Sequence, residues 1–207
     1  QRVVGWMWTQ HQDDSWGTCS VALIGPKTVV TAAHCVYSHE AGGWPKQLFF
    51  YPGATAYENI PFGEYAWDNA SVLSGYIDNY DGTNYGSVLE WDLAVIILAE
   101  PAGDQLGWMG FKVDDGSDYA AEILGYPGDK PDGTLWQSNC DITSANYYAL
   151  YMVHDCDTFA GSSGSSIFQL DGADPYVRAI NVAEDDVTNY AVRLIPTYYD
   201  WVLNLKQ

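Results

Sequence analysis

The chain has 207 residues, with 27 Asp and Glu against 8 Lys and Arg, and its formal net charge is −19 at pH 7. This acidic balance argues against a general nucleic-acid-binding protein and against docking on anionic membranes, because both partners require a basic surface. Hydrophobic residues make up 47% of the chain and aromatic residues 15%, which excludes an acidic disordered chain and predicts a folded protein with a dense, β-rich core.

No apolar run approaches the roughly 20 residues that a membrane-spanning helix needs, and residues 93–99 are among the longest such runs. The chain also starts without the apolar segment of a signal peptide, so we read it as a mature or trimmed form. A chain of this length can bury a sizeable core, either as one large domain or as two small ones.

Short β-branched or aromatic runs, separated by Gly, Pro, Asn or Asp, dominate the chain and predict β-strands. In chain order these runs are residues 20–24, 27–31, 47–51, 71–77, 93–98, 120–125, 147–153, 166–170, 176–182 and 190–194. The first two flank Gly25-Pro26 and predict a β-hairpin. The polar, turn-rich stretches 54–69 and 78–86 predict long surface loops, and a change in composition at 100–107 predicts a link between domains.

One helix is expected, at residues 197–206. Its apolar residues recur at spacings of three and four, which places them on one helical face. They are Tyr198, Trp201, Val202 and Leu205. Many short strands with a single helix are typical of a β-sandwich or a β-barrel.

The four cysteines are Cys19, Cys35, Cys140 and Cys156. They contain no Cys-x-x-Cys pair, so a structural zinc site is not expected. We interpret them as two disulfides, which indicates an oxidising, extracytoplasmic compartment. Four cysteines allow three pairings, and the residues by themselves leave the choice open.

Three local clusters contain residues suited to catalysis. His34 follows the run Thr-Ala-Ala, Asp92 heads an apolar strand, and Ser163 lies in the run Gly-Ser-Ser-Gly-Ser-Ser. Each cluster alone also fits a structural role, as a core histidine, a turn residue and a flexible loop. Together they place His, Asp and Ser in that order along the chain. The order excludes an α/β-hydrolase, which runs Ser, acid, His and needs Gly where this chain has Ser165.

The motifs Thr-Ala-Ala-His-Cys, Asp-Leu-Ala-Val and Gly-Ser-Ser-Gly resemble those of the chymotrypsin-like serine proteases, in sequence and in order. The resemblance implies an all-β fold of two six-stranded antiparallel β-barrels with a C-terminal helix. It assigns residues 1–102 to the barrel with His and Asp, 103–195 to the barrel with Ser and the specificity pocket, and 196–207 to the helix. It also implies a disulfide between Cys19 and Cys35.

The resemblance further assigns a role to each residue of the motifs. His34 is the expected general base, Asp92 orients its imidazole, and Ser163 is the nucleophile, because a serine hydroxyl attacks only when a base removes its proton. The backbone N–H groups of Gly161 and Ser163 are the expected oxyanion hole.

The run Gly-Tyr-Pro-Gly-Asp-Lys-Pro at 125–131, followed by Trp136, resembles the glutamyl endopeptidase branch of this family. This closer resemblance is weakest at residues 54–87, and it implies cleavage after Glu or Asp. Ser162 stands where animal trypsin-like enzymes have the aspartate that binds a new N-terminal ammonium. We therefore do not expect cleavage after Arg2 to be an activation switch.

The pocket departs from that branch at one position, where Asn181 replaces the histidine that contacts the substrate glutamate. The resemblance still places Thr158 against the substrate acid. Arg193 and the amine of Gln1 are the candidate cations, although cyclisation of Gln1 to pyroglutamate removes its charge. Asp157, six residues before the nucleophile, fits a preference for Arg or Lys instead. Glu or Asp is thus the expected preference, with altered, broad or basic specificity as the alternative.

Two other classes of protein remain as alternatives. One is a protease-like binding protein without turnover, whose usual sign is a broken triad. The other is a carbohydrate-binding β-module, which needs an exposed row of Trp and Tyr side chains. We expect no cofactor, because the four histidines show no paired ligand spacing and no loop motif supports calcium. The expected partners are protein or peptide substrates, with no nucleic acid or membrane, for a secreted, extracellular monomer.

Overall fold

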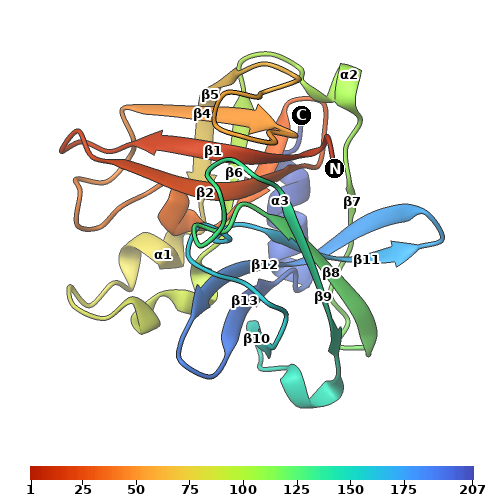
Figure 1. Ribbon diagram of the computed structural model, residues 1–207. Helices are drawn as coiled ribbons and strands as arrows, with labels where there is room; N and C mark the ends of the chain where they lie inside the picture. The colour runs from red at the N-terminus through yellow and green to blue at the C-terminus, as the bar shows by residue number, and fades with distance from the viewer.

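Six antiparallel strands from the first half of the chain close into a β-barrel in the computed structural model, which describes residues 1–207 (Figure 1). They are β1 (Val4–Gln10), β2 (Trp16–Leu23), β3 (Thr28–Thr31), β4 (Gln47–Pro52), β5 (Tyr65–Val72) and β6 (Ala94–Leu98). Around the barrel their order is β1-β2-β3-β6-β5-β4. The predicted hairpin is confirmed, because β2 and β3 are antiparallel neighbours.

Apolar side chains fill this first barrel. Strand β6 is buried at all five of its positions, and β2 is buried from Cys19 to Leu23. Both runs belong to one contiguous cluster of buried apolar side chains, which also includes Tyr198 and Val202 near the end of the chain. Removing this much apolar surface from water is the main force that holds the strands together.

Seven further strands form the second sheet. They are β7 (Gly110–Phe111), β8 (Tyr119–Gly125), β9 (Trp136–Ile142), β10 (Tyr151–His154), β11 (Ser166–Asp171), β12 (Asp174–Glu184) and β13 (Asn189–Arg193). Their order is β10-β13-β12-β11-β8-β9, and β7 pairs in parallel with β12. Strands β9 and β10 each pair with only one neighbour, so they form the two edges of this sheet. The Cys140–Cys156 disulfide joins β9 to the segment that follows β10.

The expected two-barrel, chymotrypsin-like fold is thus confirmed, with one difference. The second barrel is a seven-stranded half-barrel and not the closed six-stranded barrel expected from the sequence. A disulfide takes the place of the missing ladder of hydrogen bonds between the two edge strands.

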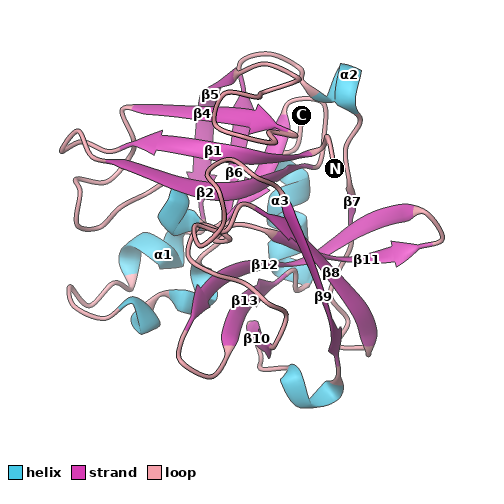
Figure 2. Ribbon diagram, in the orientation of Figure 1, coloured by secondary structure: helices cyan, strands magenta, loops and turns pink.

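Short helices and turns lie around the two sheets, and the last helix lies behind them (Figure 2). They are α1 (Ser74–Asp78), α2 (Gly103–Leu106), α3 (Pro196–Leu205) and the 3₁₀ turns η1 (Ala33–Cys35), η2 (Tyr85–Ser87), η3 (Leu89–Trp91) and η4 (Ser144–Asn146). Helix α3 is the predicted one, and it returns to the first barrel: the Tyr198 hydroxyl donates to the Glu90 carbonyl at 3.1 Å. None of the helices combines the length and apolarity that crossing a bilayer requires.

Several predicted elements need correction. The strand expected at 71–77 is wrong, because β5 ends at Val72 and residues 74–78 form α1. Most of β5 lies instead in a stretch expected to be a loop. Strands β1 and β9 were not predicted, and the run at 147–153 is a strand only from Tyr151 onward.

Candidate active site

The imidazole of His34 is held by a buried carboxylate. His34 lies in η1, directly after β3, and its backbone N–H donates to Oδ1 of Asp92 at 2.8 Å. Its ring Nδ1 lies 2.6 Å from Oδ2 of the same carboxylate. Asp92 has no solvent exposure. Two contacts to one rigid carboxylate fix the orientation of the ring and direct Nε2 away from Asp92.

The surroundings of His34 act on its pKa in opposite directions. Burial lowers the pKa, because it disfavours the charged imidazolium, whereas the charge of Asp92 and its hydrogen bond raise it. The net pKa is raised above the ordinary value. His34 is therefore a stronger base than a free histidine, as proton abstraction from a hydroxyl requires.

Tyr85 is a further donor to the buried carboxylate. Its hydroxyl donates to Oδ2 of Asp92, and its ring meets the His34 ring edge-on, with centroids 5.9 Å apart and planes at 89°. Burial and the charge of Asp92 raise the pKa of Tyr85, so the hydroxyl keeps its proton. Sequence reasoning missed this residue, because it lies in a stretch expected to be a plain surface loop.

The loop that carries Ser163 is packed tightly against the first barrel. The backbone N–H of Ser20, on β2, donates to the Ser163 carbonyl at 2.8 Å. Gly164 has φ +83°, and a Cβ there would lie 1.9 Å from Oγ1 of Thr31. Only glycine fits this position. Ser163 and His34 line one cavity of about 170 Å³, together with Gly17 and other residues of β1 and β2.

The backbone around Gly161 has the features of an anion-binding turn. Gly161 has φ +100°, and a Cβ there would lie 2.6 Å from the Tyr126 carbonyl oxygen. The Ser20 hydroxyl accepts from the Tyr126 N–H and donates to the Gly161 carbonyl at 2.9 Å, which locks the turn. The N–H groups of Gly161 and Ser163 donate to no other protein group. Both are therefore free to bind an oxyanion.

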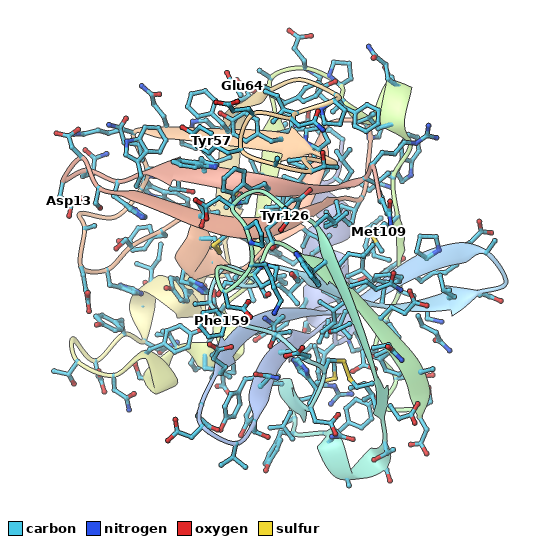
Figure 3. The ribbon with its side chains drawn as sticks, in the orientation of Figure 1. Asp13, Tyr57, Glu64, Met109, Tyr126 and Phe159 are labelled. Carbon is cyan, nitrogen blue, oxygen red and sulfur yellow. A yellow bond between two sulfur atoms is a disulfide. The ribbon has the colours of Figure 1, made fainter.

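Thr158 lies in a small cavity next to the serine loop. This cavity, of about 50 Å³, is also lined by Asp157, Phe159 and Lys130. The buried Thr158 hydroxyl has no hydrogen-bond partner within the protein. Figure 3 shows Phe159 beside the second sheet. Lys130 is the one basic residue that lines this cavity, and its Nζ lies 2.6 Å from Asp129 in a partly exposed ion pair.

Asn181 is buried and hydrogen-bonded within the protein. Its Oδ1 lies 3.0 Å from Nε2 of His154, and its Nδ2 donates to the Ser162 carbonyl at 3.2 Å. Burial lowers the pKa of His154 to about 4, so at neutral pH this imidazole is uncharged and its Nε2–H donates to Asn181. The His154–Asn181 pair thus supports the residue before the nucleophile and adds no positive charge.

Arg193 is not among the residues that line the Thr158 cavity. Its Nε donates to Oδ2 of Asp114 at 2.7 Å, and its Nη1 donates to the Tyr148 carbonyl at 2.6 Å. Asp114 also pairs with the buried Arg178 at 2.7 Å. The Arg193 guanidinium is therefore committed to a structural ion-pair network, and the structure gives no support for it as the pocket cation.

The first residues of the chain lie at a different place. Gln1 and Arg2 line a cavity with Phe62 and Thr134, and this cavity shares no residue with the one around Thr158. The candidate cations of the sequence analysis are thus not brought together with the threonine.

Both disulfides lie next to a histidine. The bonded pairs are Cys19–Cys35 and Cys140–Cys156, which settles the pairing left open by the cysteine count. The first pair gathers with His34 and the second with His154, with the candidate ligand atoms within 4.8 Å of one another. Because every sulfur is in a disulfide, none of these cysteines offers a thiolate to a metal ion.

A two-barrel fold with a His–Asp pair on one barrel and a serine loop from the other defines the class of protein. The family model named Trypsin matches residues 4–202, so the chain belongs to the trypsin family. It is 35% identical over 161 residues to a glutamyl endopeptidase of Bacillus licheniformis, a match that covers 77% of this chain and 48% of that protein. The resemblance to the glutamyl endopeptidase branch is thus confirmed.

Two further similarities are informative. An extracellular metalloprotease of Bacillus subtilis is 32% identical over 154 residues, which cover 73% of this chain and 46% of that protein. A solved structure of a Glu endopeptidase in complex with MPD superposes with a TM-score of 0.83 at 21% identity, over 99% of this chain and 90% of that chain, and shows the shared fold. The chain spans about half the length of the curated relatives that it matches.

Proposed function

We propose that this chain is a serine endopeptidase that hydrolyses peptide bonds through an acyl-enzyme on Ser163. The observation that carries the proposal is the His34–Asp92 contact of 2.6 Å at the wall of a cavity that Ser163 also lines. A base oriented by a buried carboxylate, beside a serine in the same cavity, supports acyl transfer through that serine.

Each step has a residue to perform it. His34 takes the hydroxyl proton of Ser163 as the oxygen attacks the scissile carbonyl, and it then delivers that proton to the departing amine. A water molecule, deprotonated by the same imidazole, hydrolyses the ester and restores the serine. Asp92 holds the ring and stabilises the imidazolium. The N–H groups of Gly161 and Ser163 bind the oxyanion, and losing one such donor typically costs about 10²–10³ in rate.

We further propose a preference for Glu or Asp before the scissile bond. Its support is the likeness to the Bacillus licheniformis glutamyl endopeptidase and the partnerless Thr158 hydroxyl, which is free to donate to a substrate carboxylate. Asn181, which replaces the branch's histidine, is neutral and already hydrogen-bonded. Recognition of the acid thus depends on few donors, in a protein whose net charge of −19 repels acidic substrates at long range.

Two assays test the proposal. A serine-directed phosphonate should label Ser163, and failure to label it in the folded protein would favour a non-catalytic binding protein. A peptide-library digest should then show cleavage mainly after Glu or Asp, and cleavage mainly after Lys or Arg would refute the acidic preference.

A variant sharpens the second assay. Thr158→Val removes the hydroxyl with little change in volume, so kcat/KM for a Glu substrate should fall more than for the matched Gln substrate. Equal losses on the two substrates would remove Thr158 from acid recognition.

We also propose that the protein acts outside the cell as a monomer on protein or peptide substrates. The two disulfides support an oxidising compartment. Activity in culture medium and a monomeric mass by light scattering would check these two points.

A further inference from the structure

Aromatic side chains form a row on the outer face of the first barrel. Side chains alternate between the two faces of a strand, so Trp6 and Trp8 lie on one face of β1 while Met7 between them is fully buried in the core. Trp8 is paired with Phe49 on β4, and the register places Trp16 of β2 opposite Gln10. Trp6 is only 6% exposed, whereas Trp16 is 46% exposed, so the accessible part of this row lies toward Trp16.

A loop from between β4 and β5 turns this row into a concave site. The resulting aromatic groove has a volume of about 350 Å³. Its lining residues are Trp6, Trp8, Trp16, Phe49, Tyr51, Tyr57, Ile60 and Glu64. Figure 3 shows Tyr57 and Glu64 on the first barrel, away from Phe159. Tyr57 keeps 63% of its surface exposed although it lies against two tryptophans, so its ring is available to a ligand.

Three of the rings form a corner. Trp6 and Trp8 meet at 77° with centroids 5.0 Å apart, and Tyr57 meets them at 75° and 66° with centroids 6.2 and 6.0 Å away. Two other lining rings, Trp16 and Phe49, lie nearly parallel, with planes at 17° and centroids 6.4 Å apart. The rings therefore offer both flat and angled faces to a ligand, and the charge of the groove decides between a neutral sugar and a cation.

The charge of the aromatic groove favours a cation. Glu64 is its only charged lining residue, and no basic residue lines it. Oε2 of Glu64 accepts from the Tyr51 hydroxyl at 2.7 Å, which leaves Oε1 to accept from a ligand. The faces of aromatic rings attract cations, and the net charge of −19 attracts a basic partner at long range.

The aromatic groove adjoins the catalytic cavity along two strands. Trp8 lines the groove, and its cross-strand partner Thr18, which shares its face of the sheet, lines the cavity that contains His34 and Ser163. A polypeptide that lies in the catalytic cavity therefore passes next to the groove, and one of its long side chains can enter.

We propose that the aromatic groove binds an Arg or Lys side chain of a polypeptide substrate, outside the residue at which the chain is cut. This role as a substrate site rests on the proposed endopeptidase function. Arg is the better fit, because its planar guanidinium stacks on rings while its N–H groups donate to the Glu64 carboxylate.

The test measures binding without turnover. The Ser163→Ala protein is titrated with acetyl-Gly-Gly-Arg-Gly-Gly-amide and with the same peptide carrying citrulline, the neutral isostere of Arg, while tryptophan fluorescence is recorded. The Arg peptide should bind about tenfold more tightly, a difference of about 1.4 kcal/mol. The preference should weaken as salt is added, because the partner charges are partly exposed.

Variants assign the effect to the aromatic groove. The variants Tyr57→Ala and Glu64→Gln each change one side chain of the loop between β4 and β5. Each should reduce or abolish the tighter binding of the Arg peptide over the citrulline peptide. Trp16→Leu should do the same, and Trp108→Leu is its matched control, since both tryptophans are 46% exposed and Trp108 lies outside the groove. Thermal unfolding of each variant confirms that it is folded.

The outcomes separate this proposal from the proposed function. Equal binding of the two peptides, or a preference that survives Tyr57→Ala and Glu64→Gln in folded protein, would overturn the cation site. Binding of cellohexaose in place of the Arg peptide would overturn it in favour of a sugar site. Cleavage of peptide libraries by the wild type would leave the endopeptidase standing in either case. Arg-selective binding without any cleavage would remove the endopeptidase and leave a cation-binding surface.

Discussion

Replacing Tyr85 by Phe tests how the buried carboxylate is held. Asp92 has no solvent exposure and accepts hydrogen bonds from the backbone N–H of His34, its imidazole and the Tyr85 hydroxyl. The substitution deletes this donor, together with a longer contact of the same hydroxyl to the Val182 carbonyl at 3.4 Å. A hydrogen bond to a charged group contributes about 1.5–3 kcal/mol, so the free energy of unfolding at pH 7 should fall by that amount.

The same change should alter the pH dependence of catalysis. Without the Tyr85 hydroxyl, more of the Asp92 charge acts on His34, whose pKa is already raised. Its pKa should rise further, which keeps the imidazolium protonated and inactive as a base up to a higher pH. The acid limb of kcat/KM should therefore move to higher pH, by up to about one unit. Activity should fall more at pH 6 than at pH 8.

The assay is the pH profile of kcat/KM on a fluorogenic peptide, together with urea unfolding. Tyr80→Phe is the matched control, because Tyr80 lines the same cavity as Tyr85 and His34, and its hydroxyl makes no hydrogen bond in the protein. An acid limb and an unfolding free energy that match the wild type would refute the role given to the Tyr85 hydroxyl.

Three further predictions concern the second barrel. Gly164→Ala, with its Cβ 1.9 Å from Thr31 Oγ1 at φ +83°, should lower stability by about 3 kcal/mol and displace the serine loop, and unchanged urea unfolding and kcat/KM would contradict this. The double change Cys140→Ser and Cys156→Ser opens a disulfide with a sequence separation of 16 and should cost about 3 kcal/mol by thermal unfolding. The pKa of His154 is about 6.5 in the unfolded chain and about 4 in the folded protein, so the unfolded chain binds this proton first as the pH drops. The free energy of unfolding should therefore decrease by about 3 kcal/mol as the pH falls from about 6.5 to about 4. The variant His154→Gln should show a smaller decrease over the same range in an acid titration.

The parts of the site that lie in short local motifs could be predicted from the sequence. His34, Asp92 and Ser163 each stand in a short run whose residues dictate the local backbone. The order of the three motifs then excludes a competing fold. The helix at the end of the chain was predicted from the helical spacing of its apolar face, and in the structure it starts one residue earlier, at Pro196.

Other strands and contacts lacked such a signal. Strand β9 is mostly polar and exposed, as an edge strand can be, so its residues show no buried alternation. Strand β1 contains Gly5, which usually argues against a strand. Here its missing side chain makes room for Phe50, because a Cβ would lie 2.1 Å from that ring.

Long-range partners were the hardest part of the site to foresee. Ser20 supports the Gly161 turn across 141 positions of sequence, and the pairing of Arg193 with Asp114 spans 79. No local pattern encodes either contact. Arg193 was a candidate pocket cation because of the strand on which it lies. In the structure its guanidinium forms an ion pair with Asp114.

Turnover by Ser163→Ala tests the endopeptidase mechanism most directly. The variant should keep the fold, because the Ser163 hydroxyl donates to no structural partner, and its kcat on a peptide substrate should fall by about 10⁴-fold or more. Ser165→Ala, a buried serine of the same loop whose hydroxyl has no partner, is the matched control and should retain activity. Loss of turnover confined to Ser163→Ala is the predicted result, and full activity of that variant would contradict the mechanism.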